Sequence, residues 1–128
     1  QSDMAAGKVR ELIGPDKILG VSAQTVDEAL LAEREGADYL GVGAVFPTGT
    51  KTDANAVSYD TLRDICAAVS IPVIASGGAG APEHMYDAVS KGGASAALIA
   101  SIVHYGQYTI RQCKEVMAGK GAKVRLTW

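Results

Sequence analysis

The stretch Ile71-Pro72-Val73-Ile74-Ala75-Ser76-Gly77-Gly78-Ala79-Gly80 decides the fold of this chain. Its first half is a β-branched, apolar run, which is typical of a strand covered on both faces in a parallel sheet. Its second half is small and rich in glycine, which is typical of a tight turn between a strand and a helix. Pro82, just beyond, fits the first turn of that helix. The stretch therefore predicts one strand-helix unit of a parallel α/β protein.

The same strand-then-helix pattern occurs four times along the chain. The predicted strands are residues 18–23, 39–46, 71–75 and 96–103. The predicted helices cover 4–13, a segment from the capping box Thr25-Val26-Asp27-Glu28 to a stop at Gly36, then 61–69, 82–92 and 109–117. Such alternation predicts parallel strands joined by right-handed crossovers. We therefore predict an α/β fold, a four-stranded parallel (βα)4 half of a TIM barrel with an extra N-terminal helix.

Length limits what this fold can be. The chain has 128 residues, whereas a whole (β/α)8 barrel needs at least about 200. We predict a single half-barrel domain over residues 1–128, whose open sheet has two exposed edges and an uncovered inner face. We expect oligomerisation, as a homodimer or a higher assembly, to complete the barrel. The alternative is a flavodoxin-like monomer with helices on both faces of the sheet.

Composition excludes several classes of partner. The 12 basic and 14 acidic residues give a net charge of -2 with the signs interspersed, so we expect no nucleic-acid partner. No apolar run approaches the roughly 18–20 residues of a membrane span, so we expect no membrane partner. Cys66 and Cys113 have the spacing of core residues in amphipathic helices and form no metal or disulfide motif. Cysteines of this kind favour a location in the reducing cytoplasm.

Small residues follow the third and fourth predicted strands, where ligands bind in parallel α/β proteins. Successive glycines let backbone N–H groups approach an anion, and a helix that starts there adds favourable partial charge. We therefore predict a phosphate or a small phosphorylated molecule as the ligand. The predicted phosphate-binding residues are Ser76, Gly77, Gly78, Ala79, Ala100 and Ser101. The alternative is that the glycines only permit a tight turn.

Other candidate residues lie on a loop and at a strand end. The loop Pro47-Thr48-Gly49-Thr50-Lys51-Thr52 could bind phosphate oxygens through its hydroxyls and its lysine, although a solvated loop is the alternative. Ser22, after the first strand, could donate a hydrogen bond to the same ligand. We expect His84 to be solvated and His104 to be structural. Asp3 alone makes no metal site, because Mg²⁺ needs further oxygen ligands.

These motifs resemble two families. Residues 1–70, with Gly20-Val21-Ser22-Ala23 and Phe46-Pro47-Thr48-Gly49-Thr50-Lys51, resemble the C-terminal half of thiamine phosphate synthase. Residues 71–126, with Ile74-Ala75-Ser76-Gly77-Gly78-Ala79-Gly80 and Ala100-Ser101, are similar to the cyclase subunit of imidazole glycerol phosphate synthase. Both families are phosphate-binding (β/α)8 barrels. The resemblance implies a chimeric half-barrel with a seam near residues 69–72.

The resemblance also implies roles for single residues. Thr48 and Thr50 would bind the thiazole phosphate, Lys51 and Ser22 would act as catalytic groups on the pyrimidine pyrophosphate, and Asp3 would be one of two Mg²⁺ ligands. No other cofactor is implied.

Departures from both families weigh against catalysis. The synthase groups of the earlier barrel units are not in this chain, and Gln24 stands where that family usually has histidine. The cyclase pattern needs an acid on its fifth strand, but residues 18–23 contain none. We therefore expect phosphate binding with vestigial or no catalysis. The alternatives are a thiamine phosphate synthase-type transferase that uses Mg²⁺, and a recombined structural fragment without a ligand.

Overall fold

The computed structural model of the chain describes residues 4–43, 45, 57–77 and 79–127. The strands are β1 (Gly20–Ser22), β2 (Tyr39–Gly43), β3 (Val73–Ser76) and β4 (Ala96–Leu98). The helices are α1 (Ala6–Ile13), α2 (Val26–Arg34), α3 (Tyr59–Ala68), α4 (Pro82–Ser90), α5 (Ser101–His104) and α6 (Ile110–Gly119). The strands form one parallel sheet in the order β1-β2-β3-β4. This confirms the predicted parallel α/β fold with a leading helix.

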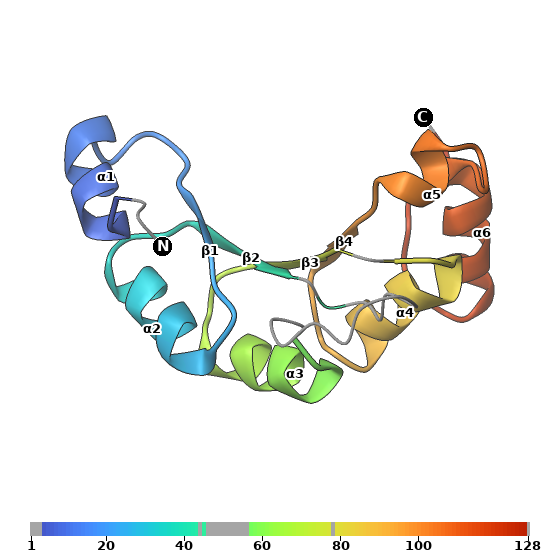
Figure 1. Cartoon of the computed structure of the whole chain (residues 1–128), viewed down its shortest axis with the longest axis horizontal. Coiled ribbons are helices and arrows are strands. Elements are labelled where there is room, and N and C mark those ends of the chain that lie inside the picture. The colour runs from blue at the N-terminus through green and yellow to red at the C-terminus, as the bar shows by residue number, and fades with distance from the viewer. Residues whose placement is uncertain (1–3, 44, 46–56, 78, 128) are drawn as a thin grey trace.

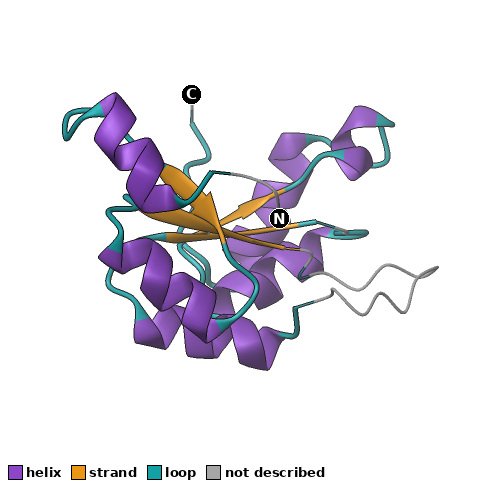
Figure 2. Cartoon of the chain, turned by 60° about the vertical axis from the view of Figure 1, so that its left-hand side comes forward, coloured by secondary structure: helices purple, strands orange, loops and turns teal. Residues whose placement is uncertain are grey.

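The helices lie on one side of a curved sheet. In Figure 1 they form an arc from α1 through α2, α3 and α4 to α6, with the strands on the inner side of that arc. A second view shows the strands as a single twisted layer above α2, α3 and α4 (Figure 2). A flavodoxin-like sheet has a strand order that reverses direction and helices on both faces. The sequential strand order and the one-sided helix layer contradict the flavodoxin-like alternative. They correspond to half of a barrel.

The main core lies between the sheet and the helix layer. Leu40 and Val42 of β2 and Val73 and Ala75 of β3 are buried, whereas their neighbours along each strand are more exposed. These side chains belong to one apolar cluster with residues of α2 and α3, including Leu62. A second cluster joins α4 to α5 and α6 through Met85, Ile102, Cys113 and Met117. Burial thus alternates along the central strands, and only their outer face is covered.

The fourth strand is shorter than the sequence predicts. The strand was expected over 96–103, but β4 ends at Leu98 and residues 101–104 form the short helix α5. The backbone leaves the extended region at Ala100, with φ -140° and ψ -70°. Ile102 is buried and Ser101 and His104 are exposed. A continuous apolar run cannot distinguish a buried strand from a turn of helix, which is why the prediction was wrong.

Two further observations concern the expected surroundings of the chain. Among the described residues, no helix is both long enough and apolar enough to cross a membrane. Cys66 and Cys113 are free thiols, the first half-buried and the second buried, as expected for core cysteines. Burial raises the pKa of both thiols, so they are less reactive than exposed cysteines.

Candidate functional site

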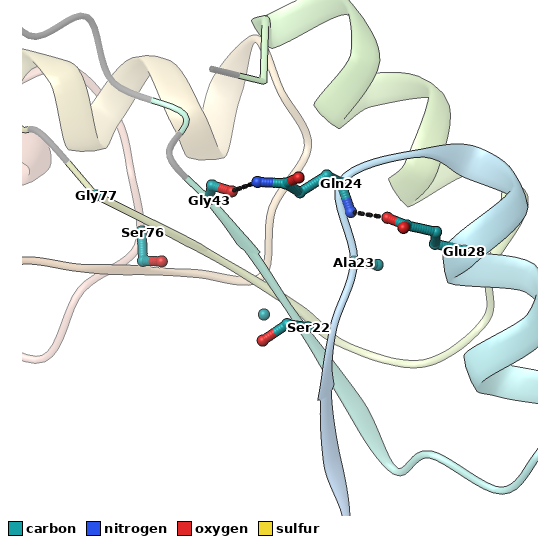
Figure 3. A pocket seen from close by; sticks show the side chains of 8 residues that line it. Ser22, Ala23, Gln24, Glu28, Gly43, Ser76 and Gly77 are labelled. Carbon is teal, nitrogen blue, oxygen red and sulfur yellow. Dashed lines mark hydrogen bonds between the residues drawn. The ribbon is translucent and has the colours of Figure 1, made fainter. Parts of the chain in front are cut away.

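A cavity of about 350 Å³ opens at the carboxyl ends of β1, β2 and β3. It is lined by Ser22, Ala23, Gln24, Glu28, Gly41, Gly43, Ser76 and Gly77. Three of these residues, Ser22, Ser76 and Gly77, were predicted from the sequence as ligand-binding residues. Figure 3 shows the hydroxyl groups of Ser22 and Ser76 pointing into the same open space from different strands. The fold therefore brings together residues that are 54 positions apart in the sequence.

Gly77 turns the chain out of β3. Its φ is +92°, a value in the left-handed region, where a side chain would cause strain. This confirms that the glycine is needed for the turn, which was the alternative explanation for the glycine-rich stretch. It leaves phosphate binding possible as well, because the same turn places backbone groups beside the cavity.

Gln24 joins the ends of β1 and β2. Its Nε2 donates a hydrogen bond to the carbonyl oxygen of Gly43 at 3.0 Å, and its backbone N–H donates to Oε1 of Glu28 at 2.8 Å (Figure 3). The sequence predicted a capping box at Thr25, and its hydroxyl does accept from the N–H of Glu28. The Glu28 carboxylate, however, accepts from Gln24. The site therefore has a carboxylate on its β1 side that the sequence did not predict.

Two glycines of β2 also line this cavity and were missed. A Cβ at Gly43 would lie 2.8 Å from Oγ of Ser76 and 2.9 Å from its carbonyl oxygen. A Cβ at Gly41 would meet nothing within 4 Å. The signal in the sequence was two glycines at alternate positions of one strand, because an interior glycine often marks a close approach of backbone. Gly43 thus permits β2 and β3 to lie close where the site is built.

The predicted residues after β4 also lie at the carboxyl ends of the strands, but outside this cavity. Ala100 and Ser101 are exposed, and Ala100 lines a separate hollow with residues of α5 and α6. They remain neighbours of the β3 turn, because Ser76 pairs with Leu98 in the sheet register. Ala79 is buried in the core. The structure therefore brings Ser22, Ser76 and Gly77 into one cavity and leaves Ala79, Ala100 and Ser101 outside it.

The helices after β3 and β4 start without a capping side chain. The residue before helix α4 is Ala81 and the residue before α5 is Ala100, and neither makes a side-chain cap; Ala5, before α1, makes none either. The helices with hydroxyl caps are α2, α3 and α6, capped by Thr25, Ser58 and Thr109. The first N–H groups of a helix have no partner within the helix. At α4, however, Pro82 has no N–H and the His84 N–H donates to the carbonyl oxygen of Ala81 at 3.1 Å, so few such donors are left to solvent or to a ligand.

His84 lies at the same turn. Its Nδ1 accepts a hydrogen bond from the backbone N–H of Gly80 at 2.9 Å, and the side chain is half-buried. The expectation that His84 is merely solvated was wrong, because a helix residue four positions after Gly80 can reach back over the turn. One amide of the glycine-rich stretch is thus already used by the protein.

Several predicted site residues lie outside the described part of the chain. These are Asp3, Thr48, Thr50, Lys51 and Gly78, and their roles stay predictions. Among the described residues, no group of three or more His, Cys, Asp or Glu side chains is placed to hold a metal ion.

Comparison with known proteins decides the family. A family model described as thiamine monophosphate synthase matches residues 1–102. The chain belongs to the thiamine monophosphate synthase family. A thiamine-phosphate synthase from Clostridium tetani is 59% identical over 78 residues, which are 61% of this chain and 37% of that protein. A solved thiamine phosphate pyrophosphorylase from Pyrococcus furiosus aligns with a TM-score of 0.70 and 31% identity, covering 94% of this chain and 58% of that one.

The chain is also similar to a second group of proteins. The imidazole glycerol phosphate synthase subunit HisF of Desulfovibrio desulfuricans is 54% identical over 115 residues, 90% of this chain and 42% of that protein. The sequence predicted this similarity for residues 71–126, a segment shorter than the alignment. The two similarities therefore overlap, and the chain is chimera-like, as predicted; the seam near residues 69–72 stays a prediction. The chain spans about two fifths of the length of these relatives.

Proposed function

We propose that the chain binds phosphate, free or as a monoester, at the carboxyl ends of β3 and β4, with little or no catalysis. The observation that carries this proposal is the glycine turn after β3, where Gly77 has a φ of +92° and lines the cavity beside Ser76. An anion at this point would accept hydrogen bonds from backbone N–H groups of the turn, which glycine lets it approach closely. Ser76 and Ser101 supply hydroxyl donors on either side of the turn.

The relatives support the choice of anion. The names of both kinds of relative contain a phosphate ester, thiamine phosphate in one and imidazole glycerol phosphate in the other. Two families that differ in their reactions thus share this part of the ligand. For a chain similar to both, we expect what the two have in common, which is a place for the phosphate group.

Electrostatics favour a position for the phosphate near β3 rather than near β1. Among the described residues that line the cavity, Glu28 carries the negative charge and no residue is basic. A phosphate beside Glu28 would be repelled, whereas the turn at Gly77 offers neutral backbone donors. The proposed position is therefore near Gly77 and Ser101, away from β1.

A titration with inorganic phosphate followed by amide NMR tests the proposal. We expect saturable shifts of the Gly77 and Ser101 amides. Ser101→Glu places a carboxylate beside the proposed anion and should weaken binding by roughly tenfold or more, equivalent to about 1.4 kcal/mol. Ser90→Glu is the matched control, because Ser90 is exposed and lies at the far end of α4 from the glycine turn. Absence of saturable shifts, or equal weakening by both substitutions, would refute the proposal and favour a fragment without a ligand.

Transferase activity is the second candidate, because the chain belongs to the synthase family and Ser22 lines the cavity. In that reaction a thiazole nitrogen forms a bond to the methylene carbon of a pyrimidine, and pyrophosphate leaves with the bonding electrons. Ser22 would donate a hydrogen bond to the leaving group, and Lys51 would neutralise it. Asp3, which the resemblance implies as a Mg²⁺ ligand, lies outside the described residues, so no step is assigned to a metal.

A product assay separates the two candidates. The chain is incubated with the pyrimidine diphosphate, the thiazole phosphate and Mg²⁺, and thiamine phosphate is measured by chromatography. Under our proposal no product forms above the uncatalysed background. Product formation that is lost in Ser22→Ala would establish the transferase instead.

A further inference from the structure

Both edges of the sheet expose unpaired backbone. In β1 the Leu19 carbonyl accepts from the N–H of Asp38, and the Ala23 N–H donates to Gly41, both toward β2. Successive residues of a parallel strand direct their backbone groups to opposite sides, so those of Gly20 and Ser22 point away from β2. By the same alternation, the Ser95 N–H donates to Val73 at 2.9 Å, which directs the groups of Ala96 and Leu98 away from β3. Each edge thus offers two residues for pairing.

Each edge also has a hollow beside it, and the hollow beside β4 is mainly apolar. Beside β1, a hollow of about 230 Å³ lies between the strand and α1 and is lined by residues that include Met4, Val9 and Leu19. Helix α1 contains no buried residue, although Val9, Leu12 and Ile13 are apolar. Beside β4, a groove of about 570 Å³ runs between the strand and α6 and includes Leu98 and Ile110. Both hollows are places where a further strand and helix would fit.

The inner face of the sheet has the chemistry of a barrel interior. Its described residues are Gly20, Ser22, Tyr39, Gly41, Gly43, Ile74, Ser76, Ala96 and Leu98, none of which is charged. Tyr39 is 36% exposed and Leu98 is 54% exposed. A sheet face that is meant for water carries charged or strongly polar side chains, whereas the inside of a barrel is filled by uncharged ones. This face therefore resembles one half of a core.

The surface area is too large for a compact monomer of this mass. The chain exposes 8033 Å², whereas a folded monomer of 13.2 kDa exposes about 6,400 Å². The excess is about 1,600 Å² per chain, and a stable protein-protein interface needs about 800 Å² from each partner. The exposed surface is thus sufficient for an extensive interface.

We propose that two copies of this chain close an eight-stranded barrel around a two-fold axis, with β4 of each copy pairing in parallel with β1 of the other. One interface type then satisfies both edges of both copies, as an isologous dimer requires. The helix α1 of one copy covers the groove between β4 and α6 of the other. Leu98, Ile74 and Tyr39 of both copies fill the shared interior. All eight strands run in one direction, so both candidate sites open on the same face.

Light scattering coupled to gel filtration tests the proposal. We expect a mass of twice 13.2 kDa. Leu98→Lys places a charge in the shared interior and should raise the dissociation constant at least about a hundredfold. Leu31→Lys is the matched control, because Leu31 is similarly exposed, at 48%, but lies on α2 in the outer helix layer. It should leave the mass unchanged. Circular dichroism verifies that both variants retain their helices.

Hydrogen exchange on the wild-type chain tests the edges themselves. The amides of Gly20, Ser22, Ala96 and Leu98 should become protected as the protein concentration rises from micromolar to millimolar. A wild-type mass of 13.2 kDa at all concentrations would overturn the proposal. So would an assembly larger than a dimer, unchanged association in Leu98→Lys, or protection that spares these four amides.

Discussion

Replacing Gly43 by alanine tests how the candidate site is built. Gly43 and Gly41 lie on the same face of β2 and both line the cavity, so each substitution adds the same methyl group at nearly the same place. At Gly43 the new Cβ would lie 2.8 Å from Oγ of Ser76 and 2.9 Å from its carbonyl oxygen. Both distances are well below van der Waals contact. The serine hydroxyl can rotate, but the carbonyl belongs to β3 and cannot move without separating the strands.

The two variants should change stability in opposite directions. Inserting a methylene into a packed site costs about 1–3 kcal/mol, which we expect for Gly43→Ala. Gly41→Ala should gain about 0.5–1 kcal/mol, because glycine in a strand loses more backbone freedom on folding and the methyl group meets no neighbour within 4 Å. The expected difference is therefore about 1.5–4 kcal/mol. For a domain of this size, each kcal/mol changes Tm by about 4 °C.

Urea unfolding followed by circular dichroism measures both changes. The two substitutions are made in the Leu98→Lys variant, where no partner chain is expected to occupy the inner face near Gly41. Phosphate affinity is measured on the same samples, because displacement of Ser76 should weaken binding in Gly43→Ala and leave Gly41→Ala close to the parent. Equal stability of the two variants would refute the inference that Gly43 permits the close approach of β2 and β3.

Two further predictions concern packing and pH. Gly92→Ala should lower the free energy of unfolding by about 1–3 kcal/mol, because the new Cβ would lie 2.3 Å from Cδ2 of buried Leu62. Gly119→Ala, at the end of α6 with nothing within 4 Å, should be neutral or stabilising; thermal melts compare the pair, and a similar loss in both would contradict this reasoning. The hydroxyl and then the N–H of Ser70 donate to Glu33 and hold the pKa of that carboxyl below its ordinary value. A carboxyl with a lowered folded pKa stabilises the fold above its unfolded pKa, and this stabilisation is lost as pH falls below about 4.3. Urea unfolding at several pH values should therefore show that acid lowers the free energy of unfolding less in Ser70→Ala than in the wild type. Equal decreases would contradict the role of Ser70 in lowering the pKa of Glu33.

The architecture could be predicted from the sequence because two independent patterns agreed. Continuous apolar runs indicated parallel strands, although the chain covers only their outer face and not both faces as predicted, and caps such as Thr25 indicated where helices begin. The end of the fourth strand could not be predicted, since Ile102 is equally apolar in a strand and in a helix. Its true conformation depends on contacts with α4 and α6, which bring Met85 and Cys113 to it.

The candidate site was predictable only in part. Ser22, Ser76 and Gly77 follow apolar runs, so their place at the strand ends could be inferred. Gln24 and Gly43 were missed because their roles depend on a contact between neighbouring strands, a hydrogen bond in one case and a close approach in the other. Such contacts depend on the register of the sheet, which a single sequence does not specify.

The sequential order of the strands bears on how such a chain could arise. Among the described residues, each strand bonds only to the strand before or after it in the chain, and the helices pack mainly on those of adjacent units. A molecule of this kind resembles a linear array in which each junction belongs to two consecutive modules. Genetic exchange of whole modules between relatives would therefore disturb one junction and leave the others intact. With this architecture, a chain assembled from segments of two ancestors can keep most of its packing contacts.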